Sequence, residues 1–332
     1  MIRHAPLIEV RGLRVGFQTA GGTVAAVDDI EFAVCAGETL AIVGESGSGK
    51  SVMSLSLLRL VPSAVTTGEI LFHGEDLLSK PAHAMRAIRG GRIGMIFQEP
   101  NTSLNPVQTI GDQIVEAIQL HQAVGKAAAR VRALEVLELT GIPSPKARMK
   151  SYPHELSGGM RQRAMIAMAL ACRPELLIAD EPTTALDVTV QAQILDLMRE
   201  LKTSSGAAII MITHDLGVVA EMADRVAVMY AGRIVEIAQV TDLFDGPEHP
   251  YTIGLLSSMP SIDGVSETLT PIEGNMPDPL AMPAGCRFQP RCPFAIARCA
   301  VEAPELVTVR PGHLSACWRA PLLDGLTQGG QQ

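Results

Sequence analysis

A glycine-rich segment at residues 44–51 contains the residue types that bind a phosphate anion, in the order Gly44, Glu45, Ser46, Gly47, Ser48, Gly49, Lys50 and Ser51. Its glycines allow the backbone to fold around an anion, so that successive N–H groups point at a phosphate. The Lys50 ammonium adds a charge between the β- and γ-phosphates, and the Ser51 hydroxyl suits Mg²⁺. We therefore predict that this loop, together with Val52, binds a nucleoside triphosphate.

The flanks of this loop have the patterns of the two elements that must position it. An apolar run over residues 38–43 predicts a buried strand, and apolar spacing from Gly49 onward predicts a helix. The positive end of that helix dipole would face the β-phosphate. A flexible turn would require neither the Lys-Ser ending nor both flanking elements, which favours a phosphate site.

Two carboxylates follow a second apolar run. Residues 176–179 predict a strand that delivers Asp180 and Glu181 at its C-terminal end, where ligands bind in open parallel α/β sheets. Asp180 suits the Mg²⁺ shell, and Glu181 can polarise an attacking water as a general base. An isolated Asp-Glu pair is more often a solvated loop, but the preceding strand and the following Pro182 favour a site.

Two further polar residues end predicted strands. The run over residues 207–213 leads to His214, which can reach the γ-phosphate side, and the run over residues 92–97 leads to Gln98, whose amide can contact both Mg²⁺ and water. A lone histidine is usually structural, but its place at a strand end favours a catalytic role. The predicted catalytic residues are Glu181, His214 and Gln98, and the predicted Mg²⁺ ligands are Ser51, Gln98 and Asp180.

These motifs resemble the ATP-binding cassette family in order and spacing, over residues 7 to about 245. The shared pattern comprises the phosphate loop, Gln98, Leu156-Ser157-Gly158-Gly159, Asp180-Glu181, Ala185-Leu186-Asp187 and His214. The resemblance implies a head-to-tail dimer in which Ser157, Gly158 and Gly159 of one subunit close over the ATP held by the phosphate loop of the other. Because these three residues open a predicted helix, their N–H groups would suit a γ-phosphate.

Two positions refine the resemblance. The chain has Met160 where the general family pattern has Gln, a departure associated with peptide-importer subunits. In the family an upstream aromatic residue stacks on adenine, and we prefer Phe17 for this role. Phe32 alternates with Ile30 and Val34, as in a core strand. The alternative is that Phe17 is a core residue as well.

The C-terminal part resembles the extension of the ATPase subunits of bacterial dipeptide and oligopeptide importers. It contains Glu248-His249-Pro250-Tyr251-Thr252, followed by a stretch with four of the six cysteines. The implied fold is α/β: a nucleotide-binding domain with a mixed sheet core, an antiparallel β subdomain and an inserted helical subdomain, followed by a small irregular Cys-rich extension. Helical spacing over residues 109–120 and 126–139 agrees with the insertion. The predicted boundaries are 1–245 for the cassette, about 99–172 for its helical subdomain and 246–332 for the extension.

The cysteines of this extension are separated by gaps of five, six and seventeen residues and are Cys286, Cys292, Cys299 and Cys317. Such a Pro- and Gly-rich tail would struggle to build its own core. A protein that consumes ATP and lacks a signal peptide belongs in the reducing cytosol, where disulfides are rare, so a metal site is favoured. Four-cysteine zinc sites usually contain Cys-x-x-Cys pairs, which are absent here. The family resemblance implies a [4Fe-4S] cluster, with zinc, free thiols or disulfides as alternatives.

Three arginines flank these cysteines and could offset the negative charge of a thiolate-ligated cluster. They are Arg287, Arg291 and Arg298. Arginines are equally at home on a solvated surface. We expect a structural or docking role for the tail rather than redox catalysis.

Composition limits the partners of the chain. Its 332 residues carry a formal charge of −8 without a basic run, so the electrostatic footprint of a nucleic-acid binder is missing. No apolar run approaches the roughly eighteen residues that span a bilayer. We expect a peripheral subunit on the cytoplasmic face of the bacterial inner membrane, which reaches the membrane through permease subunits.

The resemblance implies an ATP-hydrolysing subunit that powers import of dipeptides or oligopeptides. Its implied partners are a second ATPase subunit, either a copy or a paralogue, two permease subunits and an extracytoplasmic peptide-binding protein. Residues 99–110 are expected to contact a short helix of a permease.

The sequence alone leaves three alternative functions to consider. The same ATP-hydrolysing subunit could power transport of another cargo, such as a nickel complex, an opine or a peptide-like solute. A soluble cassette protein of DNA repair or translation would usually carry tandem cassettes, coiled coils or basic surfaces, which this chain lacks. A regulatory subunit with a dead site is disfavoured by the intact Lys50, Asp180, Glu181 and His214.

Overall fold

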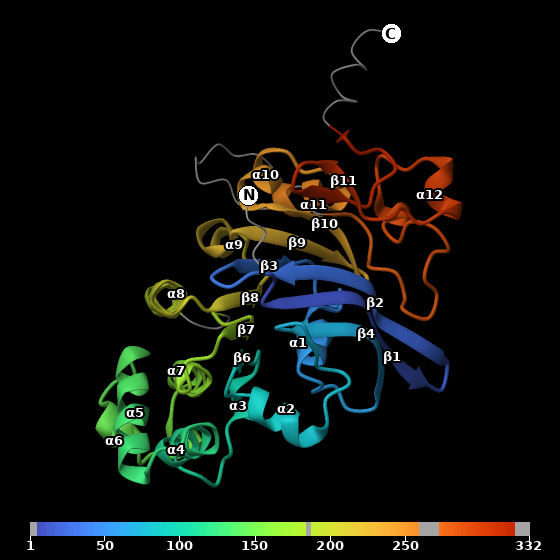
Figure 1. The fold of residues 1–332 in the computed structure, drawn as a ribbon. Helices are drawn as coiled ribbons and strands as arrows, with labels where there is room; N and C mark the ends of the chain where they lie inside the picture. The colour runs from blue at the N-terminus through green and yellow to red at the C-terminus, as the bar shows by residue number, and fades with distance from the viewer. Residues whose placement is uncertain (1–4, 184–186, 259–271, 323–332) are drawn as a thin grey trace. The chain divides into compact units, whose positions relative to one another are not determined.

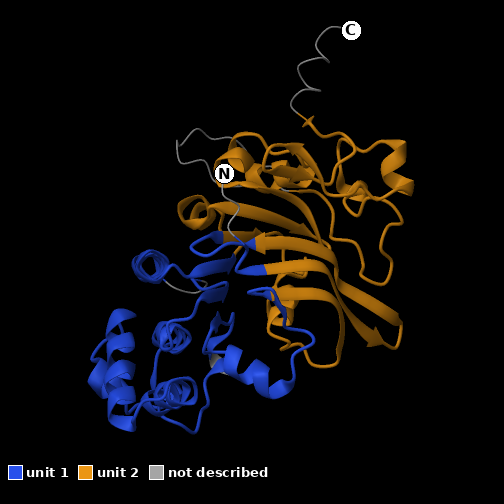
Figure 2. Ribbon diagram, viewed as in Figure 1, with its two compact units in different colours: residues 1–8, 34–39, 72–212 blue, residues 9–33, 40–71, 213–332 orange. Residues whose placement is uncertain are grey.

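The computed structural model describes residues 5–183, 187–258 and 272–322, without the side chains of residues 101 and 102 (Figure 1). Ala185 and Leu186 of the family pattern lie outside the described residues. The chain divides into two compact units that alternate along the sequence (Figure 2). Unit 1 comprises residues 1–8, 34–39 and 72–212, and unit 2 comprises residues 9–33, 40–71 and 213–332.

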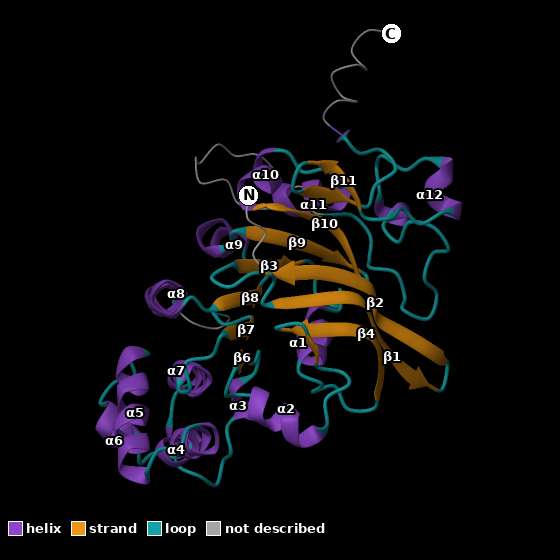
Figure 3. Cartoon of the chain, in the orientation of Figure 1, coloured by secondary structure: helices purple, strands orange, loops and turns teal. Residues whose placement is uncertain are grey.

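A β-hairpin forms the N-terminal part of unit 2 (Figure 3). β1 (Ile8–Thr19) and β2 (Gly22–Val34) are joined by a short turn, and β4 (Ala64–Phe72) lies on the other side of β1. The inward alternation of β1 shifts by one residue at Gly12, where φ is 54°. This shift keeps both halves of the long strand facing the core, through the buried Ile8, Val10, Leu13 and Val15.

Unit 2 also contains five strands of a mixed sheet, in the order β11-β12-β10-β9-β3. Their bounds are β3 Thr39–Val43, β9 Arg225–Tyr230, β10 Arg233–Gln239, β11 Val307–Arg310 and β12 His313–Ser315. β3 runs parallel to β9, with Val43 opposite Val228, whereas the other neighbours pair antiparallel. Every side chain of β3 is buried, which is typical of a strand covered on both faces.

The C-terminal extension is more regular than the sequence predicts. Its strands β11 and β12 continue the sheet from β10, which lies in the predicted cassette, residues 1–245. The fully buried carboxylate of Glu236 on β10 accepts hydrogen bonds from the backbone of Glu248 at 2.6 Å and of His249 at 3.0 Å. The helices of unit 2 are α1 Lys50–Leu57, α9 Leu216–Met222, α10 Val240–Asp245, α11 Pro250–Ser257 and α12 Ala297–Val301, with a 3-10 turn η2 at Gln289–Arg291.

Three parallel strands form the centre of unit 1, in the order β8-β7-β6. They are β6 Ile93–Ile96, β7 Leu176–Asp180 and β8 Ala208–Ile212, and all their side chains are buried. The parallel register places Asp180 opposite Ile212, so β7 and β8 end at the same edge. Strand β5 (Glu75–Asp76) and the helices α2 (Ala82–Ile88) and α8 (Val188–Ser205) complete this part of the unit.

The remaining helices of unit 1 pack around an apolar core of their own. They are α3 Pro100–Ser103, α4 Ile110–His121, α5 Lys126–Leu139, α6 Pro145–Arg148, η1 Pro153–Glu155 and α7 Gly158–Leu170. Fully or almost fully buried residues from α4, α5 and α7 meet here, including Ile114, Ile118, Ala133, Val136 and Ala167. Helix α4 begins where Thr109 caps it, with the side-chain oxygen accepting from the Asp112 N–H at 3.2 Å.

The structure confirms the strands and helices that the sequence predicts beside the site motifs. The runs over residues 38–43, 92–97, 176–179 and 207–213 form β3, β6, β7 and β8, with differences of one or two residues at the ends. The helices predicted over residues 109–120 and 126–139 form α4 and α5. Among the described helices, none is both long and apolar enough to cross a membrane.

Gly94 of β6 provides a test of the packing between this strand and α7. A Cβ at Gly94 would lie 2.6 Å from the carbonyl oxygen of Ala169 and 3.0 Å from Pro174. We predict that Gly94→Ala lowers the free energy of unfolding by about 1–3 kcal/mol, because the strand must move away from the helix. Urea unfolding followed by circular dichroism measures this change. Gly125→Ala is the matched control, because nothing lies within 4 Å of that position; equal stability of both variants would contradict the prediction.

Candidate active site

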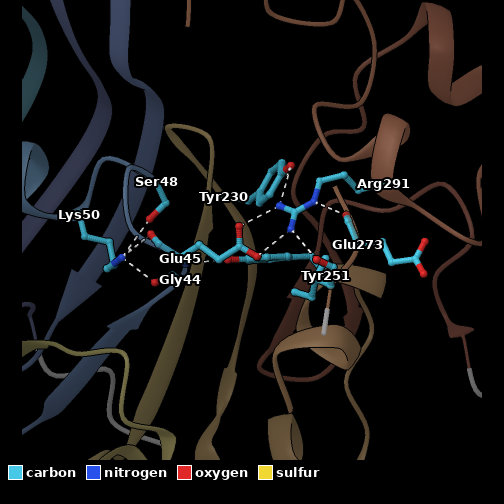
Figure 4. Close-up of polar contacts among 9 residues, drawn as sticks. Gly44, Glu45, Ser48, Lys50, Tyr230, Tyr251, Glu273 and Arg291 are labelled. Carbon is cyan, nitrogen blue, oxygen red and sulfur yellow. Dashed lines mark hydrogen bonds and ion pairs between the residues drawn. The ribbon is translucent and has the colours of Figure 1, made fainter. Parts of the chain in front are cut away.

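The phosphate loop connects β3 to α1 in unit 2 and is closed by Lys50 (Figure 4). The Lys50 Nζ donates to the carbonyl oxygens of Gly44 at 2.6 Å and Glu45 at 2.7 Å, and to the Ser48 Oγ at 3.1 Å. Only 7% of Lys50 is exposed. The ammonium charge is therefore held within the curve of the loop, as phosphate binding requires.

Two glycines of the loop lie directly against backbone carbonyls. Gly44 has a φ of 152°, and a Cβ there would lie 2.1 Å from the carbonyl oxygen of Met229. Gly49 has a φ of 100°, and a Cβ there would lie 2.3 Å from the carbonyl oxygen of Ala26. Gly47, with a φ of 81°, has open space around it. Packing within unit 2 thus excludes a side chain at positions 44 and 49, in addition to the backbone angles.

Tyr251 supports the loop from helix α11. Its hydroxyl accepts a hydrogen bond from the Glu45 backbone N–H at 2.8 Å, while its fully buried ring packs on Tyr230 and Phe288 with centroids 4.6 and 5.5 Å apart. Burial raises the pKa of Tyr251 and outweighs the opposing hydrogen bond from Glu45, so the phenol keeps its proton. His249 caps α11 by accepting from the Tyr251 N–H at 3.1 Å, and burial lowers its pKa to about 3. The sequence contains the motif at residues 248–252, but nothing in it predicts that Tyr251 contacts the backbone of Glu45.

In unit 1 the predicted carboxylates lie at the end of β7. Asp180 is buried, with 3% exposed, and Glu181 follows it with a left-handed φ of 49°. That backbone is held by a hydrogen bond from the Glu181 N–H to the Ile212 carbonyl at 2.9 Å, and costs on the order of 1 kcal/mol. The Gln98 Nε2 donates to the Glu181 Oε2 at 3.3 Å. The structure therefore brings the predicted general base and the predicted water-positioning amide into contact.

The predicted partner-contacting residues begin helix α7 in the same unit. Ser157 caps the helix by accepting from the Met160 N–H at 3.3 Å, and Ser157 and Gly158 are exposed while Gly159 is half-buried. Gln162, only 3% exposed, donates its Nε2 to the Pro182 carbonyl at 2.9 Å. This bond ties α7 to the segment that follows Glu181. The only sequence signal for Gln162 is a polar residue on the apolar face of a helix.

The other predicted nucleotide residues lie in unit 2. Ser51 and Val52 are half-buried in the first turn of α1, and His214 is exposed just before α9. Phe32 is buried, as expected of a core strand, and Phe17 is half-buried in β1. The candidate residues are thus divided between the units: the phosphate loop, Phe17 and His214 in unit 2, and Gln98, Ser157, Gly158, Gly159, Asp180 and Glu181 in unit 1.

The four cysteines of the extension line one cavity of about 10 Å³, and all are free thiols. Burial raises the pKa of Cys292 to about 11, which disfavours the thiolate. The cavity has room for about one water molecule, so a [4Fe-4S] cluster does not fit the side chains as they are arranged. Within the described parts of the chain, no group of three or more His, Cys, Asp or Glu side chains is placed to hold a metal ion. The predicted metal site is therefore not supported by this geometry.

The arginines beside these cysteines are all engaged with carboxylates. The carboxylate partners are Asp28 for Arg287, Glu45 for Arg291 and Glu302 for Arg298. These pairs satisfy the guanidinium groups in the absence of any thiolate. The pair with Glu45 reaches the phosphate loop, which the sequence did not predict.

Two family models match the chain. The model described as ABC transporter matches residues 27–184, and the one described as oligopeptide/dipeptide transporter, C-terminal region, matches residues 235–299. The first match includes the phosphate loop, Gln98, residues 157–159 and both carboxylates. The second includes three of the four clustered cysteines.

Curated relatives match over nearly their whole length. The oligopeptide transport ATP-binding protein OppD of Escherichia coli is 52% identical over 94% of this chain and 93% of its own length. The dipeptide transport ATP-binding protein DppD of Bacillus subtilis is also 52% identical, over 94% of both chains. Among solved structures, a dimeric ATP-binding cassette in a post-hydrolysis state with ADP and Pi has a TM-score of 0.65 and 26% identity, covering 70% of this chain and 98% of its own.

The contact at Gly49 provides a test of the phosphate loop. We predict that Gly49→Ala weakens ATP binding by more than about tenfold, equivalent to ~1.4 kcal/mol, because the Cβ would displace the loop from Ala26. Isothermal titration calorimetry measures the affinity. Gly47→Ala is the matched control: it shares the positive φ but meets no atom within 4 Å, so its loss should be smaller. A larger loss for the Gly47 variant would contradict the role assigned to packing.

Proposed function

The chain belongs to the ABC transporter family, and we propose that it is the ATP-hydrolysing subunit of an importer for dipeptides or oligopeptides. The observation that carries this proposal is the coexistence of a phosphate loop closed by Lys50 and a strained Glu181 in contact with Gln98. The relatives named for oligopeptide and dipeptide transport support the cargo class. The match of the C-terminal region to oligopeptide/dipeptide transporters supports it independently of the cassette.

In this proposal the two sets of site residues act on one ATP. The loop N–H groups and the Lys50 ammonium bind the phosphates, and Phe17 stacks on the adenine. Ser51, Asp180 and Gln98 would hold Mg²⁺, which neutralises charge on the phosphates when bound. Glu181 accepts a proton from the attacking water, which Gln98 orients and His214 helps to place on the γ-phosphate side.

A second cassette subunit, either a copy or a paralogue, would complete each site. The exposed N-terminus of α7, with Ser157, Gly158 and Gly159, presents N–H groups to the ATP of the partner subunit. The similarity to a dimeric cassette supports this arrangement. Because Gln162 links α7 to the segment after Glu181, closure of the dimer would act directly on the hydrolytic residues of the same subunit.

The remaining partners follow from the importer class. We propose two permease subunits that receive the ATPase at residues 99–110, an extracytoplasmic peptide-binding protein, and a peripheral position on the cytoplasmic face of the bacterial inner membrane. This segment contains Thr109, which caps α4, and the exposed Glu99, and the exposed Gln98 directly precedes it. The alternative is that the same ATPase subunit powers transport of another cargo, such as a nickel complex or an opine.

Glu181→Gln tests the proposed ATPase activity and the proposed peptide cargo together. We predict retained ATP binding, accumulation of the closed dimer and a fall in steady hydrolysis of at least about 100-fold, because the amide cannot accept the proton of water. Phosphate release by the purified protein and uptake of labelled di- and tripeptides by cells that carry only the variant are the two measurements. Normal turnover would remove Glu181 from the general-base role. Lost turnover with unchanged peptide uptake would contradict the cargo.

We also propose, on the sequence resemblance alone, that the four cysteines, which line one cavity, share a ligand. The sequence resemblance favours a [4Fe-4S] cluster and leaves zinc and free thiols as alternatives. Since the cavity is too small as arranged, binding would require the cysteine side chains to move apart. This proposal is independent of the ATPase assignment.

Metal content tests the shared ligand. We expect about four irons and four acid-labile sulfides per chain after anaerobic purification, with a visible absorption band that Cys299→Ser abolishes. Cys172→Ser is the matched control, because Cys172 belongs to unit 1 and does not line the cavity of the four cysteines. One zinc per chain without iron would identify the shared ligand as zinc and not an iron–sulfur cluster. If the anaerobically purified protein contains neither iron nor zinc, and all four thiols react with an alkylating agent, a shared metal is refuted.

A further inference from the structure

Arg291 reaches from the cysteine-rich extension to the phosphate loop within unit 2 (Figure 4). Its guanidinium donates to both carboxylate oxygens of Glu45, at 2.8 and 3.1 Å. It also donates to the backbone carbonyls of Glu273 at 2.9 Å and Ile272 at 3.2 Å, and contacts the Tyr230 hydroxyl at 3.4 Å. The guanidinium is therefore held in a fixed fork, with the bidentate geometry that gives strong carboxylate pairing.

The pair is mostly removed from water. The Arg291 side chain is 5% exposed and the Glu45 side chain 29% exposed. On the other side of Glu45, its backbone N–H donates to Tyr251, and its carbonyl accepts from Lys50. Glu45 is thus fixed at its side chain by Arg291 and at its backbone by two further residues. The Arg291–Glu45 pair therefore differs from a mobile surface ion pair, which contributes little to stability.

Glu45 is the one acidic residue of the phosphate loop, residues 44–51. An unpaired carboxylate on the loop that is proposed to bind a triphosphate would repel it, because salt screens charges only beyond about 8 Å. A cationic partner that neutralises Glu45 removes that repulsion. The guanidinium of Arg291 meets this need, because it holds both carboxylate oxygens.

We propose that Arg291 is a positioning residue for ATP, which neutralises Glu45 and holds its carboxylate away from the bound phosphates. The inference rests on the proposed ATPase function and deepens it, because it makes the extension part of the nucleotide site. Arg291 lies at the end of η2, between Cys286 and Cys292, and the Cys292 N–H donates to the Gln289 carbonyl at 3.2 Å. A disturbance of the cysteines is therefore transmitted to the phosphate loop through this short turn.

Four variants test the charge pairing: Arg291→Gln, Arg291→Lys, Glu45→Gln and the double variant Arg291→Gln/Glu45→Gln. ATP affinity is measured by calorimetry, and KM and kcat by phosphate release. Arg291→Gln is expected to weaken ATP binding on the order of tenfold and to raise KM more than it lowers kcat. Adding Glu45→Gln should restore affinity to within about threefold of the wild type, and Arg291→Lys should keep part of it.

Arg298→Ala is the control variant, because this arginine also flanks a clustered cysteine but pairs with the exposed Glu302. Its ATP affinity should match the wild type. If Arg291→Gln does not fold, Arg291→Lys replaces it, since the loss of ATP affinity that it causes should likewise be reversed when Glu45→Gln is added.

Three results would overturn the inference. They are an unchanged affinity for folded Arg291→Gln, a double variant as weak as Arg291→Gln, and an Arg291→Lys variant as weak as Arg291→Gln. In each case, a wild type that binds and hydrolyses ATP leaves the proposed function standing. A wild type that binds no ATP refutes the proposed function and this inference with it.

Discussion

The nucleotide part of this protein depends on a tight loop whose backbone must stay curved while it carries both charge signs. Lys50 holds the carbonyls of Gly44 and Glu45 inside the curve, and the glycines at 44 and 49 touch neighbouring backbone carbonyls with no room for a Cβ. Such a loop cannot be held by its own residues alone, because short glycine-rich segments have many accessible conformations. The strands that contact it, β9 and β2, therefore belong to the site as much as the loop does.

The extension supplies the rest of this support. Tyr251 binds the Glu45 backbone, Arg291 binds its carboxylate, and the rings of Tyr230, Tyr251 and Phe288 fill the space between. Buried Glu236 then anchors the start of the extension to β10, and β12 pairs with the same strand. The extension is consequently built into unit 2, and its cysteines lie in the same packed region as the aromatic residues that support the loop.

The residues proposed to hydrolyse ATP illustrate a different principle. β7 carries Asp180 and Glu181 to a strand end, and the left-handed backbone at Glu181 turns the chain sharply after the buried Asp180. The hydrogen bond to Ile212 on β8 holds this strained residue, since strain persists only where the surroundings fix it. Gln98 and Gln162 then connect β6 and α7 to the same segment. Two side-chain hydrogen bonds thus connect Glu181 and the residue after it to the neighbouring strand and helix.

The sequence by itself determined the family and the elements that carry the motifs. Glycine spacing, apolar runs before polar residues and helical spacing are local properties, so the strands β3, β6, β7 and β8 and the helices α4 and α5 could be predicted from them. Only the tertiary structure revealed that Arg291 pairs with Glu45 and Tyr251 binds its backbone, across separations of 246 and 206 residues. It also placed the cysteines around a cavity too small for the predicted cluster. No local pattern encodes such contacts, because they arise when segments far apart in the chain pack against each other.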